Sequence, residues 1–329
     1  MLRSILALAF LALAQPVFAL CSGTSLLDRL SPADQFFLDD VSANTPYGRG
    51  LVWVATRDRQ QITLVGTMHI YDPRLAPIRA QVTDDIASAD LVLLEMTETE
   101  EAQLQAELAT NPDRMFLTEG PSLIELLDQQ TWEMVAEAAA ARQIPAFMAA
   151  KFRPWYLAVS LAIPPCAMPD MVAGRRGLDK MILEDANAAG VPTQAIEPWD
   201  TLFNVMEVGT LDEQIDMMRL GLLSPEINRE VFVAMLNGYF AGEVAQVWEM
   251  SRLSLKYVPD LDVELAKEMF ALTEQGLLID RNRNWIPVIE AASADHDRMV
   301  VAVGAAHLPG EIGVLRLLER EGWTISAAN

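Results

Sequence analysis

Two short segments share one pattern, a glycine followed three residues later by a histidine, and they carry side chains suited to catalysis. They are Gly66-Thr67-Met68-His69 and Gly304-Ala305-Ala306-His307, near opposite ends of a 329-residue chain that contains 3 histidines. Each follows an apolar, β-branched run, so each histidine is expected just beyond a buried strand. A glycine at such an exit permits a positive φ or a close backbone approach. We interpret the two turns as halves of one site.

Two acidic residues follow other predicted strands in the same way. The apolar run 89–94 stops at Glu95, and the run 192–196 stops at Glu197. Because the crevice of an open α/β sheet lies beyond the carboxyl ends of its strands, these carboxylates can meet His69 and His307 there. Imidazole and carboxylate groups bind divalent ions such as zinc, manganese or cobalt, and a bound ion makes water nucleophilic. The pattern favours a hydrolytic site with a divalent metal.

A third group of candidates opens a predicted helix near the C-terminus. Arg281 and Arg283, with Trp285 close by, could offer a fixed positive charge to a substrate carboxylate or a developing oxyanion. The alternatives are simpler: Glu95 and Glu197 could cap helices or pair with Arg281, and the arginines could be surface charges. A single strand-end histidine is also more often structural than a ligand. His296, between two aspartates, is most simply a surface loop residue.

Hydrophobic periodicity predicts the elements that must position these residues. A hairpin of strands 51–56 and 61–65 precedes a helix over 75–88 and the strand ending at Glu95. Further expected elements are a mostly helical stretch over 101–162, a helix over 177–189, a strand over 192–196, a helical block over about 202–276, a helix over 281–293, a strand over 299–303, a helix over 310–321 and a strand over 323–326. The sequence therefore predicts an α/β fold with a mixed central sheet, flanking helices and a helical insertion at about 202–276.

The N-terminal segment has the features of a secretory signal peptide. Arg3 precedes an apolar run over 5–13, and Pro16 and the small-residue exit Val17-Phe18-Ala19 follow. That run is shorter than the roughly 18 to 20 residues that a membrane span needs, and charge or proline interrupts every later apolar stretch. We expect cleavage after Ala19 and a single exported domain over 20–329, periplasmic in a Gram-negative bacterium or secreted.

The two cysteines leave their state open at this level. Cys21 and Cys166 could pair in an oxidising compartment or remain unpaired thiols, because sequence does not give the separation of their Cα atoms. Leu20 disfavours lipid modification of Cys21, since such sites prefer a small residue at that place.

Net charge narrows the range of partners. The formal charge of −22 argues against nucleic acid and anionic membranes, because the average surface repels phosphate groups. We therefore expect a peptide or small-molecule substrate.

The candidate residues lie in segments that resemble the TraB/GumN family, which is similar to the TIKI metalloproteases and, more distantly, to the ChaN and erythromycin-esterase group. The resemblance rests on Leu64–His69, Leu94-Glu95, Gly177-Leu178-Asp179, Ile196-Glu197, Arg281–Trp285 and Val303–Val314. It implies an α/β core with a helical insertion and peptide-bond hydrolysis assisted by manganese or cobalt. His69 and His307 would be metal ligands, Glu95 a ligand or general base, and Arg281 an electrostatic stabiliser, with Glu197 as a further catalytic candidate.

Two other functions fit the same residues. In one, His69 and His307 act as general acid and base in an esterase-like site without a metal. In the other, the chain is a non-catalytic exported protein that binds a small anionic ligand through Arg281 and Arg283. All three hypotheses need the two histidines, or the charges beside them, to converge on one crevice.

Overall fold

The computed structural model describes residues 21–207 and 209–328. The predicted signal peptide and its cleavage site fall on residues 1–19, which lie outside the described residues. Over the part of the chain that is described, none of the helices combines the length and apolar character needed to cross a membrane.

A six-stranded mixed sheet forms the centre of the fold, with the strand order β4-β3-β5-β2-β1-β6. The predicted hairpin is confirmed: β1 (Val52–Arg57) pairs antiparallel with β2 (Gln60–Thr67). The remaining strands are β3 (Leu91–Leu94), β4 (Thr193–Ala195), β5 (Arg298–Gly304) and β6 (Thr324–Ala327). Strands β2, β5, β3 and β4 run parallel to one another, and β1 is antiparallel to both β2 and β6. The predicted α/β class is therefore confirmed.

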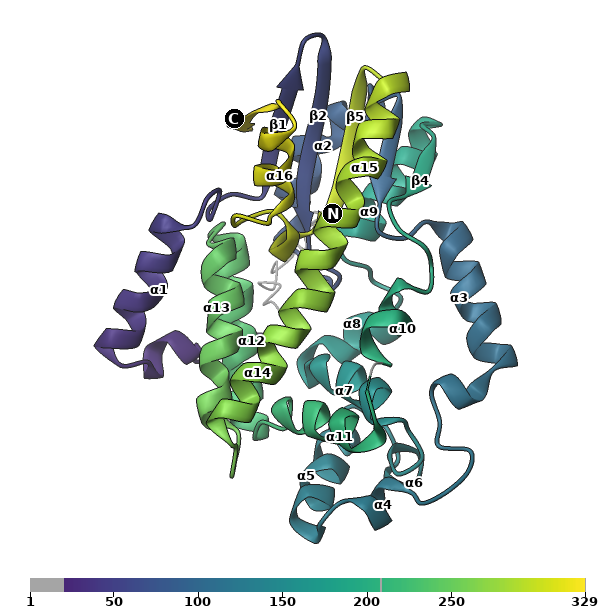
Figure 1. The fold of residues 1–329 in the computed structure, drawn as a ribbon, viewed down its shortest axis with the longest axis vertical. Helices are drawn as coiled ribbons and strands as arrows, with labels where there is room; N and C mark the ends of the chain where they lie inside the picture. The colour runs from purple at the N-terminus through teal and green to yellow at the C-terminus, as the bar shows by residue number, and fades with distance from the viewer. Residues whose placement is uncertain (1–20, 208, 329) are drawn as a thin grey trace, which may run out of the picture.

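Helices cover both faces of the sheet. Alternate strand residues Val65 and Ala302 pack against α2 (Leu75–Ala87) and α9 (Leu178–Ala189), whereas their neighbours Leu64 and Val301 pack under α15 (Asp280–Asp295) and α16 (Val314–Arg320). This alternation follows from the two-residue period of a strand, which sends successive side chains to opposite faces. Figure 1 shows the resulting layers, with α15 and α16 in front of the sheet and α2 and α9 behind it.

A helical part lies at the edge of the sheet where the parallel strands end (Figure 1). Two separate segments build it. The first supplies α3 (Glu98–Thr110), α4 (Leu123–Leu126), α5 (Gln129–Ala140), α6 (Ala146–Ala149), α7 (Pro154–Ala162) and α8 (Met168–Val172), and the second supplies α10 (Thr201–Met206), α11 (Leu211–Leu220), α12 (Pro225–Phe240), α13 (Val244–Ser254) and α14 (Val263–Glu274). The two segments share one apolar core, in which Val135 and Leu157 meet Ile215 and Met218. The block expected at about 202–276 is thus joined by helices from the earlier segment.

One long helix connects the helical part to the sheet. Helix α14 continues without a break through a π-helical segment, Gln275–Ile279, into α15. The sequence predicted a helix from Arg281, but α15 begins at Asp280 and is already continuous with α14. Short π segments occur frequently at functional sites, because they alter the side-chain register of a helix and free carbonyl groups. Arg281 therefore stands two residues beyond this segment, at the junction of the two parts.

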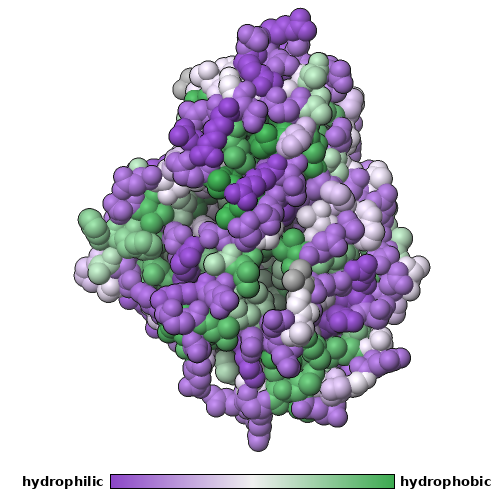
Figure 2. Space-filling model, in the orientation of Figure 1, coloured by the Kyte–Doolittle hydropathy of each residue, from purple (hydrophilic) through white to green (hydrophobic). Residues whose placement is uncertain are grey.

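The N-terminal region is tied to the helical part. Cys21 and Cys166 form a disulfide, with Cα atoms 5.2 Å apart, which decides between the two states that the sequence left open. Helix α1 (Pro32–Asn44) then packs beside α13 and leaves Phe36 72% exposed. On the face shown in Figure 2, polar side chains surround smaller hydrophobic patches, one of them at the edge that α1 occupies.

Candidate active site

The two Gly-x-x-His turns lie side by side at the ends of adjacent parallel strands. Gly66 of β2 is paired with Val303 of β5, so the two glycines are offset by a single register position. A Cβ atom added at Gly66 would lie 3.0 Å from Leu308 Cδ1 and 3.1 Å from Ala305 Cα. The absence of a side chain at Gly66 thus lets the Gly304–His307 turn pack closely on the Gly66–His69 turn. The structure therefore brings the two motifs together.

Arg281 is the centre of a buried polar cluster between these strand ends. Its Nε donates to Glu197 Oε2 at 2.9 Å, and its Nη2 lies 2.6 Å from both Glu197 Oε1 and Glu95 Oε2. Its Nη1 lies 3.2 Å from Leu277 O and 3.2 Å from His307 Nε2. A guanidinium group has five N–H donors, and here each has an acceptor. The Arg281 side chain is only 14% exposed, so this network is largely shielded from water.

Glu95 is held as a carboxylate by its neighbours. One oxygen accepts from the Gly304 N–H at 2.6 Å, and the other accepts from Arg281. Burial alone would raise the pKa of this carboxyl group. The adjacent His307 and Arg281, together with the Gly304 hydrogen bond, outweigh burial and hold the pKa well below its usual range. Glu95 is therefore ionised at neutral pH.

His307 is buried, with only 4% of its surface exposed, and its tautomer follows from its partners. Asn282 donates through Nδ2 to Ile312 O, so its Oδ1 faces His307 Nδ1 at 2.7 Å. That oxygen can only accept, which places the proton on Nδ1 and leaves Nε2 to accept from Arg281. Burial lowers the pKa of His307 to about 3, so the ring is neutral, and it packs on Trp285 with ring centres 4.3 Å apart.

His69 has a different environment. Its side chain is 66% exposed, and its Nδ1 lies 3.2 Å from Asp179 Oδ2. The contact with Asp179 raises the pKa of His69 to about 9, although solvent around so exposed a ring screens part of the effect. Among the described residues, no partner contacts His69 Nε2. This nitrogen is therefore available to a water molecule or a substrate.

The loop that carries His69 is fixed from two sides. A Cβ atom added at Gly177, the N-cap of α9, would lie 2.1 Å from Met68 O, and Leu178 N donates to the same oxygen at 2.9 Å. Tyr239 of α12 donates its hydroxyl to Gly66 O at 2.9 Å. Burial, together with the charge of Asp179, raises the pKa of Tyr239, so it remains a donor. Helix α9 and the helical part together set the position of His69.

The predicted site residues thus fall into two groups. Glu95, Glu197 and His307 all contact Arg281, whereas His69 stands apart with Asp179. The charges of Glu95 and Arg281 nevertheless act on the pKa values of both histidines, so the groups share one electrostatic environment.

The remaining sequence candidates lie outside the cluster. Arg283 is 55% exposed and lies 3.8 Å from Asp280. His296 follows α15, and its Nδ1 lies 2.9 Å from Ala292 O.

A divalent metal does not fit the donors as they are arranged. Within the described residues, there is no group of three or more His, Cys, Asp or Glu side chains that could hold a metal ion. Arg281 already occupies His307 Nε2 and one oxygen of Glu95, and Gly304 N–H occupies the other. One feature does suit a metal site: each histidine has an oxygen partner at Nδ1, an arrangement that orients Nε2 for ligation.

Sequence reasoning missed three residues that shape the site. Asn282 sets the tautomer of His307, Asp179 contacts His69, and Tyr239 holds the turn between them. Asp179 lies in one of the segments that carry the family resemblance, and an acidic residue in the first turn of a predicted helix was a usable signal. Asn282 adjoins Arg281, but nothing in the sequence gives the direction of its side chain. Tyr239 lies within an apolar helix and carried no signal.

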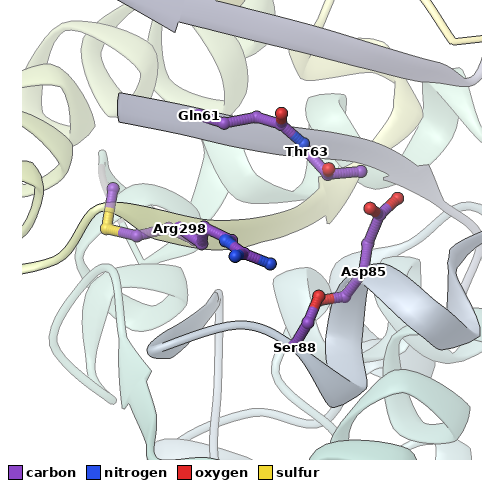
Figure 3. A pocket seen from close by; sticks show the side chains of 6 residues that line it. Gln61, Thr63, Asp85, Ser88 and Arg298 are labelled. Atoms are coloured by element: carbon purple, nitrogen blue, oxygen red, sulfur yellow. The ribbon is translucent and has the colours of Figure 1, made fainter. Parts of the chain in front are cut away.

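The two cavities outlined in the structure are separate from this cluster. One, of about 120 Å³, lies at the opposite end of β2 and β5, where Arg298 extends toward Asp85 and Ser88 (Figure 3). The other, of about 440 Å³, lies among α5, α11 and α14 in the helical part. Neither contains a residue of the histidine turns.

The fold and site define an α/β protein with a His, Glu and Arg cluster at the carboxyl ends of its parallel strands. The chain belongs to the TraB/PrgY/gumN family, whose pattern it matches over residues 51–327, and the suspected family is thereby confirmed. A search of curated proteins finds no match.

Proposed function

We propose that this protein is an exported hydrolase in which His69 and Asp179 activate water for attack on an ester or amide carbonyl. The observation that carries the proposal is the state of His69: an exposed ring, oriented at Nδ1 by a carboxylate, with Nε2 open. A histidine held in this way can act as a general base. Its position beside a buried charged cluster at the carboxyl edge of an α/β sheet supports the same conclusion.

The proposed reaction uses His69 twice. Nε2 of the neutral form of His69, whose population grows as the pH rises through about 9, accepts a proton from water as the water oxygen bonds to the carbonyl carbon. Asp179 stabilises the imidazolium that forms. The tetrahedral oxyanion then re-forms the carbonyl, its bond to the alcohol or amine breaks, and the imidazolium donates its proton to that leaving group. Attack and departure each leave the proton count balanced, and no cofactor is consumed. In this scheme the cluster of Glu95, Glu197 and Arg281 fixes the position of the Gly304–His307 turn, and its opposite charges pair with one another.

A metal-dependent hydrolase, with manganese, cobalt or zinc, is the second candidate. The Nδ1 contacts of His69 and His307 favour it, because an oxygen atom that accepts from Nδ1 commonly orients the Nε2 of a metal-binding histidine. The occupied donors of Glu95 and His307 oppose it, and for this reason it ranks second.

A ligand-binding protein without catalysis receives less support. That hypothesis needs Arg281 and Arg283 as anchors for an anion. All five N–H donors of Arg281 already have acceptors, and Arg283 is exposed away from the cluster.

The test is turnover of chromogenic esters and fluorogenic peptides by the purified protein, with and without a chelator. We expect chelator-resistant hydrolysis that falls roughly 100-fold or more in His69→Ala, the usual contribution of a general base. His296→Ala is the matched control, because His296 lies outside the cluster, and it should retain wild-type rates. Equal rates in His69→Ala and wild type would reject the proposed role of His69. Chelator-sensitive turnover would favour the second candidate.

Export is proposed on two grounds. The N-terminal sequence is typical of a signal peptide, and the Cys21–Cys166 disulfide is typical of a protein that folds in an oxidising compartment. Expression of the full chain in a Gram-negative host, followed by fractionation and intact-mass measurement, tests this. We expect periplasmic protein that begins at Leu20; full-length protein confined to the cytoplasm would contradict the proposal.

A further inference from the structure

We propose that Arg281 is the resident cation of this site and excludes a divalent metal ion from it. The inference concerns the same residues as the proposed hydrolase, but it does not depend on hydrolysis. It runs against the metal dependence that the family resemblance implies, and it rests on which atoms Arg281 occupies.

The first step is that Arg281 and a metal would need the same acceptors. A metal ligated by His307 would bind Nε2 at about 2.0 to 2.1 Å along its one lone pair. That lone pair already faces Arg281 Nη1 at 3.2 Å, because Nδ1 carries the ring proton toward Asn282. Arg281 also occupies Glu95 Oε2, which accepts a hydrogen bond from Nη2 at 2.6 Å. Metal ligation there requires Arg281 to leave.

The second step is that Arg281 is firmly held. Glu197 binds it through two parallel contacts, Oε1 to Nη2 and Oε2 to Nε, the fork geometry in which arginine binds carboxylates most strongly. Leu277 O, a carbonyl of the π-helical segment, accepts from Nη1, and the guanidinium lies 4.9 Å above the Trp285 ring. Trp285 also donates to Glu197 at 2.9 Å and so fixes this carboxylate in place. Displacement of Arg281 would break several contacts at once.

The third step concerns charge. The Glu95, Glu197 and Arg281 side chains are 17%, 12% and 14% exposed, so one buried cation already faces two buried anions. A divalent ion placed among the same groups would be repelled by the guanidinium at short range and low effective dielectric. With Arg281 removed, the acceptors that it occupies on His307, Glu95 and Glu197 would be free, and a divalent ion could draw these side chains together, which their present placement does not do.

The test measures metal binding directly. Wild-type protein is incubated with Mn²⁺, Co²⁺ or Zn²⁺, desalted and assayed for metal by mass spectrometry, and Co²⁺ is then titrated by calorimetry. We expect wild type to retain well below one ion per chain. Arg281→Ala should bind Co²⁺ roughly 100-fold more tightly than wild type, because a repelling charge is removed and three donors are released. Co²⁺ should also raise the thermal midpoint of this variant alone.

Two controls make the result specific to this site. Arg283→Ala removes an exposed arginine two residues away and should gain no affinity. Addition of Glu95→Gln to Arg281→Ala should abolish the gain, because it removes one of the released donors.

Stoichiometric metal in wild type, or equal Co²⁺ affinity in wild type and Arg281→Ala, would overturn the inference. If Arg281→Ala does not fold, the wild-type metal content and Arg281→Gln decide the matter. If wild-type protein without bound metal shows no hydrolysis, the proposed function is contradicted and this inference is unaffected.

Discussion

The two Gly-x-x-His turns have the same sequence pattern and adjacent positions, yet their histidines differ in almost every physical respect. His69 is exposed, contacts a carboxylate and has a raised pKa, whereas His307 is buried, contacts an amide and a guanidinium, and has a lowered pKa. The difference arises from what packs on each turn. One turn therefore presents an exposed ring to solvent, and the other belongs to the charged cluster around Arg281.

The largest expected effect comes from removing the centre of the cluster. Arg281→Ala should lower the free energy of unfolding by about 3 to 5 kcal/mol, because two buried carboxylates lose their counter-charge. Urea denaturation measures this, and hydrolysis should be lost as well. Arg283→Ala, the exposed control, should stay within about 0.5 kcal/mol of wild type. Equal stability of Arg281→Ala and Arg283→Ala would mean that the Arg281 cluster does not stabilise the Gly304–His307 turn.

The comparison predicts opposite responses from the two histidines. His307→Ala should destabilise the fold by about 1 to 3 kcal/mol, because it leaves buried groups of Asn282 and Arg281 without a partner. His69→Ala should change stability by less than about 1 kcal/mol, because its ion pair is largely exposed. For the rate of the chemical step the order is reversed, because His69→Ala should lower this rate more than His307→Ala does. Parallel denaturation and kinetic measurements test both halves, and a more stable His307→Ala would contradict the assignment.

The docking of α9 on the first turn gives a smaller prediction. Gly177→Ala places a Cβ against the backbone of Met68 and His69, so we expect a loss of about 1 to 3 kcal/mol and slower turnover. Gly221→Ala is the control, because the nearest atom to its added Cβ is 3.5 Å away, an ordinary contact. Crystal structures or amide exchange of the two variants would locate the displacement. Unchanged kinetics in Gly177→Ala would show that the His69 loop tolerates the shift.

The smallest expected effect is on pH dependence. Asp179→Asn should lower the pKa of His69 from near 9 toward 6.5, as followed by NMR titration. Because the folded-state pKa is raised, the pair stabilises the fold fully below pH 6.5, and this contribution is lost as the pH rises through about 9. The stability difference between wild type and Asp179→Asn should therefore be larger at about pH 6 than at about pH 10. A pH-independent difference would mean that Asp179 does not pair with charged His69.

Much of the fold was predictable because local patterns and tertiary structure agree. The continuous apolar run before Glu95 predicted a buried strand, and the helix predicted over 177–189 ends as α9 does, just before Gly190, which adopts the left-handed conformation. The helical part was harder to predict. Amphipathic helices from the segments 98–172 and 201–274 share one core, and periodicity shows which face is apolar without showing its partner.

The sequence by itself determined that two histidines and two glutamates follow strands, and parallel pairing then brings such strand ends to one edge. Only the tertiary structure decided how the two histidines differ. Helix α15 covers the second turn with Trp285, Asn282 and Arg281, while α9 meets the first turn at its backbone and leaves the ring exposed. Burial, and with it the pKa of an imidazole, depends on contacts between segments that are distant in sequence. For that reason two turns with the same Gly-x-x-His pattern hold a buried neutral ring and an exposed ring that contacts a carboxylate.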